Sequence, residues 1–175
     1  MPVQRSESPV SRERLEATAF DLLEASTLFS LATVTPQGGA YVNTAYFARG
    51  PRFQLVWLSD PDARHSRNLS ESASTAIAVY DSQQTWGRPD RGIQLFGAAH
   101  AAGEDEAAAA EDAYAARFPD FRAKNLWAYR FYVFQPERVK LFDEVGLGGG
   151  QFIVAAVDES GRLSWETTEI YRSDS

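Results

Sequence analysis

The stretch "LSDPDARHSRNLSES", residues 58–72, collects cations at the start of a short expected helix. Asp60 is a suitable N-cap and Pro61 suits the first helical position, so the stretch predicts a helix start. Arg64 and Arg67 then fall in the first turns. Positive side chains there cost a few tenths to about 1 kcal/mol each unless an anion lies among them. The stretch therefore indicates an anion-binding site.

The spacing of the polar residues makes this site more specific. Arg64, Arg67 and Asn68 are at positions i, i+3 and i+4, so they share one helix face. Ser59 ends the preceding strand, close to the free N–H groups of the first helical turn, which also bind anions. A phosphate group suits this set. Spacing alone leaves an alternative open, in which the arginines pair on a solvated surface with Asp60, Asp62 or Glu71.

Composition excludes several classes of protein. The 175 residues, 44% of them hydrophobic and 13% aromatic, fit a single globular domain. No cysteine and only two histidines leave little material for a metal centre, and we expect none. A net charge of -7 argues against nucleic acid as a partner. No apolar run approaches the roughly 18 residues of a membrane span, and "MPVQRSESPV" has no signal core, so we expect a cytoplasmic protein without membrane contacts.

Hydrophobic periodicity predicts a mixed α+β chain. Leu15, Ala19, Leu22 and Leu23 recur at helical spacing. The expected elements are a helix at 11–26, a three-stranded meander at 28–35, 40–49 and 53–59, the basic helix at 60–71, strands at 74–82 and 91–101, a helix at 103–118 and strands over 126–144 interrupted by Pro136. We expect one domain over 1–175. Residues 1–10 should be flexible, and 144–175 a weakly specified extension with a glycine turn and one strand.

Several strands are apolar on both faces. Leu55 and Trp57 alternate with Val56 and Leu58, and the run "GIQLF" repeats the pattern. A sheet with one solvated face would alternate polar and apolar residues instead. The pattern favours a small closed barrel, mainly β, with flanking helices or a second subunit covering its outside.

Other chemistry is poorly supported. The chain has no G-x-S-x-G motif, and nothing places its two histidines in a catalytic triad. The glycines of "GLGGG" match no dinucleotide-binding pattern, so we interpret them as a turn. In "ERVK", Arg138 or Lys140 could touch a ligand, but a solvated strand is the simpler interpretation.

The order and spacing of four segments resemble the pyridoxamine 5'-phosphate oxidase-like FMN-binding split-barrel superfamily, over about residues 11–143. The segments are "SLATVTPQGGAYVNTAYFA", "FQLVWLSDPDARHSRNL", "STAIAVYDS" and "RGIQLFGAA". The resemblance implies a six-stranded antiparallel split β-barrel with flanking helices. It also implies a homodimer with FMN in the cleft between subunits, so that the expected anion is the flavin's phosphate.

The resemblance also assigns residues to the cofactor. The family's phosphate-binding Arg-Lys pair corresponds to Arg64 and His65, and Gln94 is the candidate for a hydrogen bond to the ring. The preceding strand end corresponds to Trp57, Leu58 and Ser59, and the strand against the flavin ring to Asn43, Thr44 and Ala45.

This chain departs from pyridoxamine phosphate oxidase itself at two places. Asn43 and Ala48 stand where that enzyme has basic residues at the two ends of its flavin strand. The enzyme's substrate-binding arginine and histidine near the C-terminus have no counterpart in "FDEVGLGGGQFIV". The vitamin substrate is therefore not implied.

The expected function is an FMN-dependent oxidoreductase acting on a small molecule, with a nicotinamide nucleotide or oxygen as second partner. Hydride and electron transfer belong to the flavin, so no catalytic residue is assigned. Substrate walls could come from Trp86, Trp127, Tyr129 and Phe131, although strand aromatics are usually core or dimer contacts. Two alternatives stay open. One is a deazaflavin-dependent enzyme of the same fold, and the other a non-catalytic flavin or haem binder with His65 or His100 as axial ligand.

Overall fold

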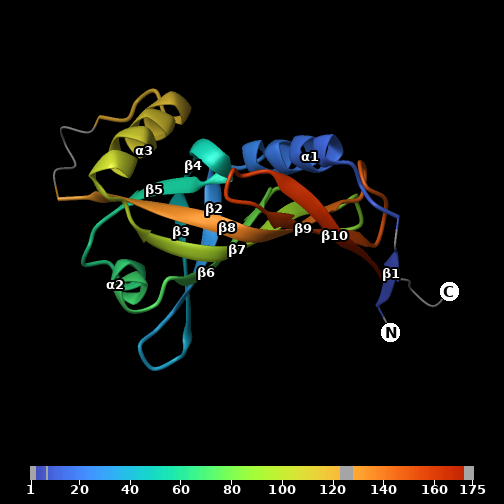
Figure 1. Ribbon diagram of the computed structural model, residues 1–175, viewed down its shortest axis with the longest axis horizontal. Coiled ribbons are helices and arrows are strands. Elements are labelled where there is room, and N and C mark those ends of the chain that lie inside the picture. Colours follow the sequence, from blue (N-terminus) through green and yellow to red (C-terminus); the bar gives the residue numbers. More distant parts are fainter. Residues whose placement is uncertain (1–2, 7, 123–127, 172–175) are drawn as a thin grey trace.

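A computed structural model describes residues 3–6, 8–122 and 128–171. The α+β class is confirmed, since these residues form a mostly antiparallel sheet and three α-helices (Figure 1). The helices are α1 (Arg12–Glu24), α2 (Arg64–Glu71) and α3 (Glu104–Arg117), and a 3-10 turn, η1, covers Pro51–Phe53. The strands are β1 (Gln4–Ser6), β2 (Leu28–Val34), β3 (Ala40–Tyr46), β4 (Ala48–Arg49), β5 (Leu55–Ser59), β6 (Ser74–Tyr80), β7 (Arg91–Ala101), β8 (Arg130–Asp143), β9 (Gln151–Val157) and β10 (Leu163–Ile170).

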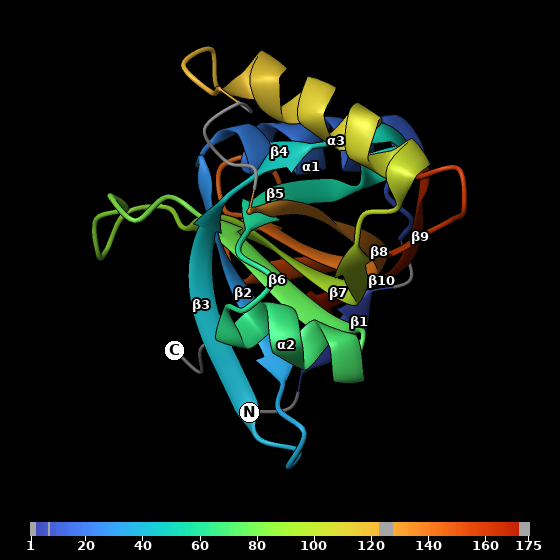
Figure 2. The ribbon, with the colours of Figure 1, turned by 90° about the vertical axis from the view of Figure 1, so that its left-hand side faces the viewer.

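The described strands form one open sheet, so the expectation of a closed barrel is wrong. The main path runs β1-β10-β9-β8-β7-β6-β2-β3, and β5 pairs separately with β4 and β8. Strands β3 and β5 lie close together without pairing (Figure 2). Strand β5 pairs along its whole length with β8, and its other edge pairs only at Leu55 and Val56, with β4. The expected three-stranded meander therefore forms only in part, because β3 pairs with β2 but not with β5. The result is a barrel split along the β3–β5 seam.

The segments near both ends of the chain contain more β-strand than the sequence predicts. Residues 144–175 contain two strands, not one: β9 and β10 form a hairpin that extends the sheet from β8. Strand β1, within the N-terminal segment expected to be flexible, pairs with β10. The hairpin is tied to α1, because Arg12 donates to the Leu163 carbonyl and Arg162 pairs with Glu16. Long-range pairing of this kind leaves little local sequence signal.

Strand β8 passes through Pro136 without interruption, contrary to the expectation. The register against β7 shifts there, with Phe96 opposite Arg138 and Gly97 opposite Pro136, so Glu137 is an extra, bulged residue. A bulge is one of the few places where a strand accepts proline. A Cβ atom on Gly97 would lie 2.2 Å from the carbonyl oxygen of Gln135, so the close approach requires glycine.

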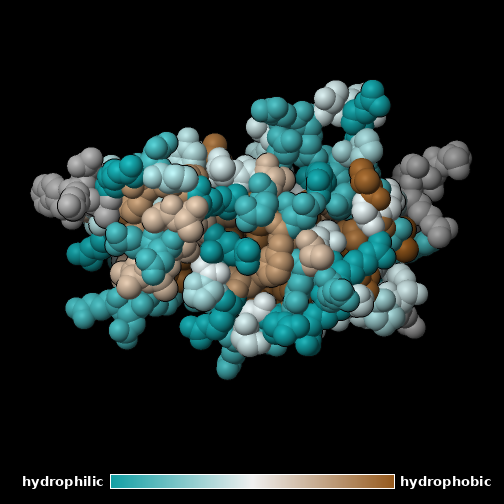
Figure 3. Space-filling view, turned by 90° about the horizontal axis from the view of Figure 1, so that it is seen from above, coloured by the Kyte–Doolittle hydropathy of each residue, from teal (hydrophilic) through white to brown (hydrophobic). Residues whose placement is uncertain are grey.

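Two packed clusters explain why β5 is apolar on both faces. On the inner side, Trp57 stacks on Tyr132 at a centroid distance of 5.4 Å and joins the core with α1. On the other side, Val56 packs with Ala110 of α3. One chain thus buries both faces of this strand. Seen from above, the surface over α1 and α3 is mostly hydrophilic, and a pale brown patch at its left end lies over alanine-rich α3 (Figure 3).

Strands β3, β2, β6 and β7 have one face towards the core and α1, and their other face is not covered by a described helix. We call it the outer face. Alternate residues of these strands point into the core, and their neighbours point outward. Large apolar side chains are exposed on it, namely Leu28, Val42, Tyr46, Tyr80 and Phe96. Within the described residues, no helix is long and apolar enough to cross a membrane.

Helix α2 begins at Arg64, three residues later than the start at Pro61 that Asp60 as N-cap would give. The Asp60 carboxylate accepts from the backbone N–H of Asp62 at 2.8 Å, and its carbonyl accepts from Ala63 N–H at 3.1 Å. Asp60 therefore caps a turn rather than the helix. The helix N-cap is Ala63, which has no side chain to bond the first-turn N–H groups.

Two buried hydrogen bonds fasten α2 to the barrel. His65 Nε2 and Ser59 Oγ lie 2.8 Å apart, joining the first turn to the end of β5. Asn68 Nδ2 donates to Thr33 Oγ1 on β2 at 2.9 Å. All four side chains are buried. Burial also lowers the pKa of His65, because desolvation disfavours the charged imidazolium.

Replacing Gly161 by alanine should destabilise the fold strongly. Its φ is +80°, and a Cβ atom would lie 2.2 Å from the carbonyl carbon of Arg52. Gly38 is a matched control, with φ +80° but no atom within 4 Å of the added Cβ. We expect Gly38→Ala to cost about 1 kcal/mol and Gly161→Ala roughly 2–4 kcal/mol in urea unfolding. Equal losses would contradict the close contact between Gly161 and Arg52.

The buried His65 should make the protein less stable in mild acid. An unfolded histidine has a pKa of about 6.5, so below that pH the unfolded chain takes up a proton that the folded imidazole resists. Stability is thus present above this pH and lost as the pH falls through it. Between about pH 7.5 and about pH 5.5 we expect the melting temperature of His65→Gln to fall less than that of the parent. An equal fall in both proteins would contradict an uncharged, buried imidazole.

Candidate functional site

Arg64 and Arg67 of α2 line a cavity and form no ion pair in the part of the chain that the structure describes. Both are exposed, and together with Pro36 and Gln37 of the β2–β3 turn and Glu71 of the same helix they border a cavity of about 330 Å³. Neither guanidinium forms an ion pair or side-chain hydrogen bond within residues 3–6, 8–122 and 128–171. The alternative in which they pair with neighbouring carboxylates is therefore not what the structure shows.

The backbone of α2 adds to this positive character. Arg64 is the first helical residue, so its side chain lies at the positive end of the helix dipole. Ala63 offers no side-chain cap, and the first-turn N–H groups consequently have no side-chain acceptor at the N-cap. Unpaired cations and free N–H groups at one helix end suit a phosphate monoester.

Strand β3 carries an unsatisfied acceptor near the split. Asn43 Oδ1 is buried and has no hydrogen-bond partner in the described chain, while its Nδ2 makes only a long 3.4 Å contact with the Thr44 carbonyl. A buried acceptor without a donor costs roughly 1–3 kcal/mol. It suits an N–H or O–H group of a ligand. Trp57 Nε1 is also unpaired, but it lies deep in the core.

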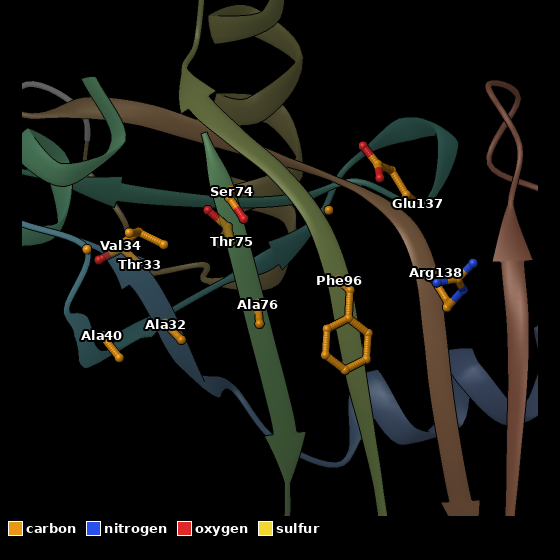
Figure 4. A pocket seen from close by; sticks show the side chains of 12 residues that line it. Ala32, Thr33, Val34, Ala40, Ser74, Thr75, Ala76, Phe96, Glu137 and Arg138 are labelled. Atoms are coloured by element: carbon orange, nitrogen blue, oxygen red, sulfur yellow. The ribbon is translucent and has the colours of Figure 1, made fainter. Parts of the chain in front are cut away.

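The outer face contains two adjoining hollows. Gln94 borders the smaller, of about 260 Å³, with Ser30, Val42 and Ala78 among its lining residues. The larger, of about 480 Å³, lies beside it over β2, β6, β7 and β8 (Figure 4). Phe96 contributes to both hollows. They exist because the outward side chains of β2 and β6 are mostly small.

The structure divides the expected site residues into groups. Ser59 and His65 are bonded to each other in the interior at the start of α2, whereas Arg64 is exposed and lines the cavity of about 330 Å³. Asn43 and Ala45 point to the inner side of β3, and Thr44 points to its outer side. Thr44 and Gln94 share one row of the outer face, through Ser30 and Ala78. Gln94 and Asn43 therefore lie on opposite faces of the sheet.

The side chains of three expected site residues make contacts within the fold. The side chain of Trp57 is fully buried in the core, and Leu58 packs towards α3. The amide of Asn68 is occupied by Thr33, so it positions α2. Sequence reasoning missed Thr33, and it also missed the turn residues Pro36 and Gln37, whose distance from α2 along the chain gives no signal.

The expected aromatic walls are scattered. Phe131 packs under α3, whereas Tyr129 is exposed. Trp86 is exposed in the loop between β6 and β7. Trp127 lies outside the described residues. His100, the other histidine, is at the surface with its Nε2 2.9 Å from Glu106.

Comparison with solved structures identifies the same fold in several proteins. The haem storage protein HutZ of Vibrio cholerae is 21% identical with a TM-score of 0.64, covering 77% of this chain and 99% of that one. A Clostridium acetobutylicum protein related to general stress protein 26, of the pyridoxinephosphate oxidase family, is 13% identical with a TM-score of 0.60, covering 86% and 99%. An F420 reductase is 22% identical with a TM-score of 0.52, covering 68% and 93%.

These identities are low, so the neighbours establish the fold alone. No curated protein matches the sequence. The model of one protein family, described as pyridoxamine 5'-phosphate oxidase, matches residues 15–143, which is well over half of the chain. The match spans β3, the basic helix α2 and β7, which carries Gln94. The chain belongs to the pyridoxamine 5'-phosphate oxidase family.

Proposed function

We propose that this protein is a homodimeric FMN-binding oxidoreductase acting on a small molecule. The observation that carries the proposal is the pair of uncompensated guanidinium groups, Arg64 and Arg67, at the uncapped first turn of α2. Membership of the pyridoxamine 5'-phosphate oxidase family supports FMN as the source of the phosphate.

The residues present fit the proposed cofactor at both of its ends. Arg64 and Arg67, which line the cavity beside α2, would hold the phosphate, and the buried hydrogen bond between Ser59 and His65 would position the helix that carries them. The unsatisfied Asn43 Oδ1 would accept a hydrogen bond from a ring N–H or a ribityl hydroxyl. Hydride and electron transfer are the chemistry that a flavin supplies when bound. The chain's own contribution is then binding and orientation.

The structure favours a flavin over haem. One solved neighbour is a haem storage protein, so haem deserves consideration. However, His65 Nε2 is bonded to Ser59 within the fold, and His100 Nε2 is bonded to Glu106. Both imidazoles thus already have partners. A deazaflavin such as F420 also carries a phosphate, and the absorption spectrum of the ligand released from purified protein distinguishes it from FMN.

The larger outer hollow is the proposed substrate space. Its volume of about 480 Å³ falls within the range of small-molecule sites. Its floor of alanine, serine and threonine suits a flat molecule, and Arg138 at its rim is already paired with Glu166. A nicotinamide nucleotide is the proposed electron donor.

The outer face supports the proposal of a homodimer. Five large apolar side chains are exposed on it, and Val42 is 61% exposed. They lie on either side of a row that contains Thr44, Ser30 and Gln94, and large apolar side chains exposed on one face favour association with another surface. Two-fold symmetric dimers are the commonest soluble oligomers, and a second copy would cover the face.

Arg64→Ala should weaken FMN binding and leave riboflavin binding nearly unchanged, because riboflavin has the same ring without a phosphate. A hydrogen bond to a charged group is worth about 1.5–3 kcal/mol, which corresponds to roughly ten- to a hundredfold in FMN affinity. Fluorescence titration measures both ligands. The apo variant should melt at the parent temperature or slightly above, since a cation leaves the positive helix end. Equal weakening of both ligands would refute the phosphate assignment.

Sedimentation should show one species of twice the 19.4 kDa chain mass. Val42→Glu, on the outer face, should shift it to monomer, because a carboxylate would be buried at the interface. Val145→Glu is the matched control, since Val145 is 79% exposed on the turn after β8. A parent monomer that still bound flavin would contradict the dimer.

A further inference from the structure

The cavity beside α2 has opposite charges along its length. Among the described residues that line it, three are charged, namely Arg64, Arg67 and Glu71. Arg64 is the first residue of α2 and Glu71 is the last. With a rise of about 1.5 Å per residue, the backbone of Glu71 lies roughly 10 Å along the helix from that of Arg64 and roughly 6 Å from that of Arg67. The cavity therefore changes from positive to negative along the helix.

Both kinds of charge oppose the helix dipole. A carboxylate is favoured at the N-terminal end of a helix and a cation at the C-terminal end, whereas α2 has no acidic residue in its first turn and no basic residue in its last. Glu71 forms no ion pair within residues 3–6, 8–122 and 128–171, although Arg67 is one helical turn away. Helix stability therefore does not account for the carboxylate at this position, just as it does not account for the arginines.

The rest of the lining is neutral. Two of its polar side chains are already bonded within the fold, since the Asn68 amide donates to β2 and the Ser70 hydroxyl donates to the Arg67 carbonyl at 2.7 Å. The opposite wall is the turn between β2 and β3, which is closed by a bond of 2.8 Å from the Thr35 N–H to the Gly39 carbonyl. Discrimination between ligands by charge is therefore left to the three charged residues.

The cavity has more room than one phosphate group needs. Its volume of about 330 Å³ is at the lower end of the range for whole small-molecule sites. In the proposed function the ring end of the cofactor lies at Asn43, which is not among the lining residues of this cavity. The space towards Glu71 is then available to any group attached to the far side of the phosphate. FMN has no such group, FAD has a second phosphate with adenosine, and F420 has a tail that carries carboxylates.

We propose that Glu71 selects the cofactor, by admitting a ligand that ends in a phosphate monoester and disfavouring one whose phosphate continues into further anionic groups. This inference rests on the proposed function. Arg64 and Arg67 together match the charge of about −1.5 to −2 on one phosphate monoester. The second phosphate of FAD, or a tail carboxylate of F420, would instead lie close to the carboxylate of Glu71. An unfavourable contact with the wrong ligand is a common source of specificity.

Titration with FMN and FAD tests the role of Glu71. The parent should bind FMN at least about tenfold more tightly than FAD. Glu71→Gln keeps the size of the side chain and removes its charge. We expect this variant to bind FAD about five- to tenfold more tightly than the parent does, and FMN about twofold more tightly at most, because the lost carboxylate lies closer to the second phosphate than to the first. The preference of the parent for FMN should shrink between about 0.05 and about 0.5 M salt, since screening weakens the repulsion.

Glu111→Gln is the matched control. Glu111 is an exposed carboxylate on α3, and like Glu71 it forms no ion pair with another residue that the structure describes. Its neutralisation should leave the affinities for FMN and FAD at the parent values. Apo Glu71→Gln should melt at the parent temperature or slightly above, because a negative charge leaves the negative end of α2. A melting temperature well below that of the parent would make Glu71 a structural residue and overturn the inference.

The outcomes separate this inference from the proposed function. A parent protein that bound neither FMN nor FAD would overturn the proposed function and this inference with it. A parent that bound FMN, with FAD bound equally tightly or with the same ratio of the two affinities in Glu71→Gln, would overturn the selection by Glu71 alone. Tighter FAD binding in Glu71→Gln, with unchanged binding in Glu111→Gln, would support it.

Discussion

The position of α2 depends on two buried hydrogen bonds, from Ser59 to His65 and from Asn68 to Thr33. A helix of eight residues has little stability of its own, so tertiary contacts must hold it. Leu69, packed into the core, supplies the apolar part of this attachment. Because the helix is fixed from its inner side, its outward residues, Arg64 and Arg67, can carry unfavourable charges at the helix start although neither forms an ion pair with another described residue.

The split of the barrel separates two kinds of surface. The sheet around β5 is covered on both sides by one chain, since α3 packs where a solvated face would otherwise be. The outer face of β3, β2, β6 and β7 has no such cover. Small residues there leave hollows, and large ones such as Val42 and Phe96 border them. The hollows and the exposed apolar side chains therefore lie on the same face, so the proposed substrate space and the proposed dimer contact would adjoin each other.

The C-terminal hairpin has a structural role outside the segment that the family model matches. Strand β9 pairs with β8 and β10 pairs with β9, and the hairpin contacts α1 through Arg12, Glu16 and Arg162. Gly161 of the hairpin turn approaches the backbone of Arg52, which itself has a φ of 51°. The hairpin thus braces the segment that leads into β5 and the site.

Local sequence signals determined most elements and the nature of the basic site. Helical spacing of Leu15 and Ala19 placed α1, and the unfavourable charges of Arg64 and Arg67 indicated an anion, because both effects act over a few neighbouring residues. Edge pairing acts between segments far apart in the chain. Only the tertiary structure could therefore decide that β5 pairs with β8, that β9 and β10 join the sheet, and that the barrel stays open.

The first residue of α2 also depends on the tertiary structure. Asp60 is able to cap either a helix or a turn, and the sequence does not distinguish the two. The hydrogen bond between Ser59 and His65 attaches the first turn of α2 to the end of β5. Sequence could not show that Asn43 and Gln94 lie on opposite faces of the sheet, because strand register, which places every side chain on one face or the other, is set by the partner strands.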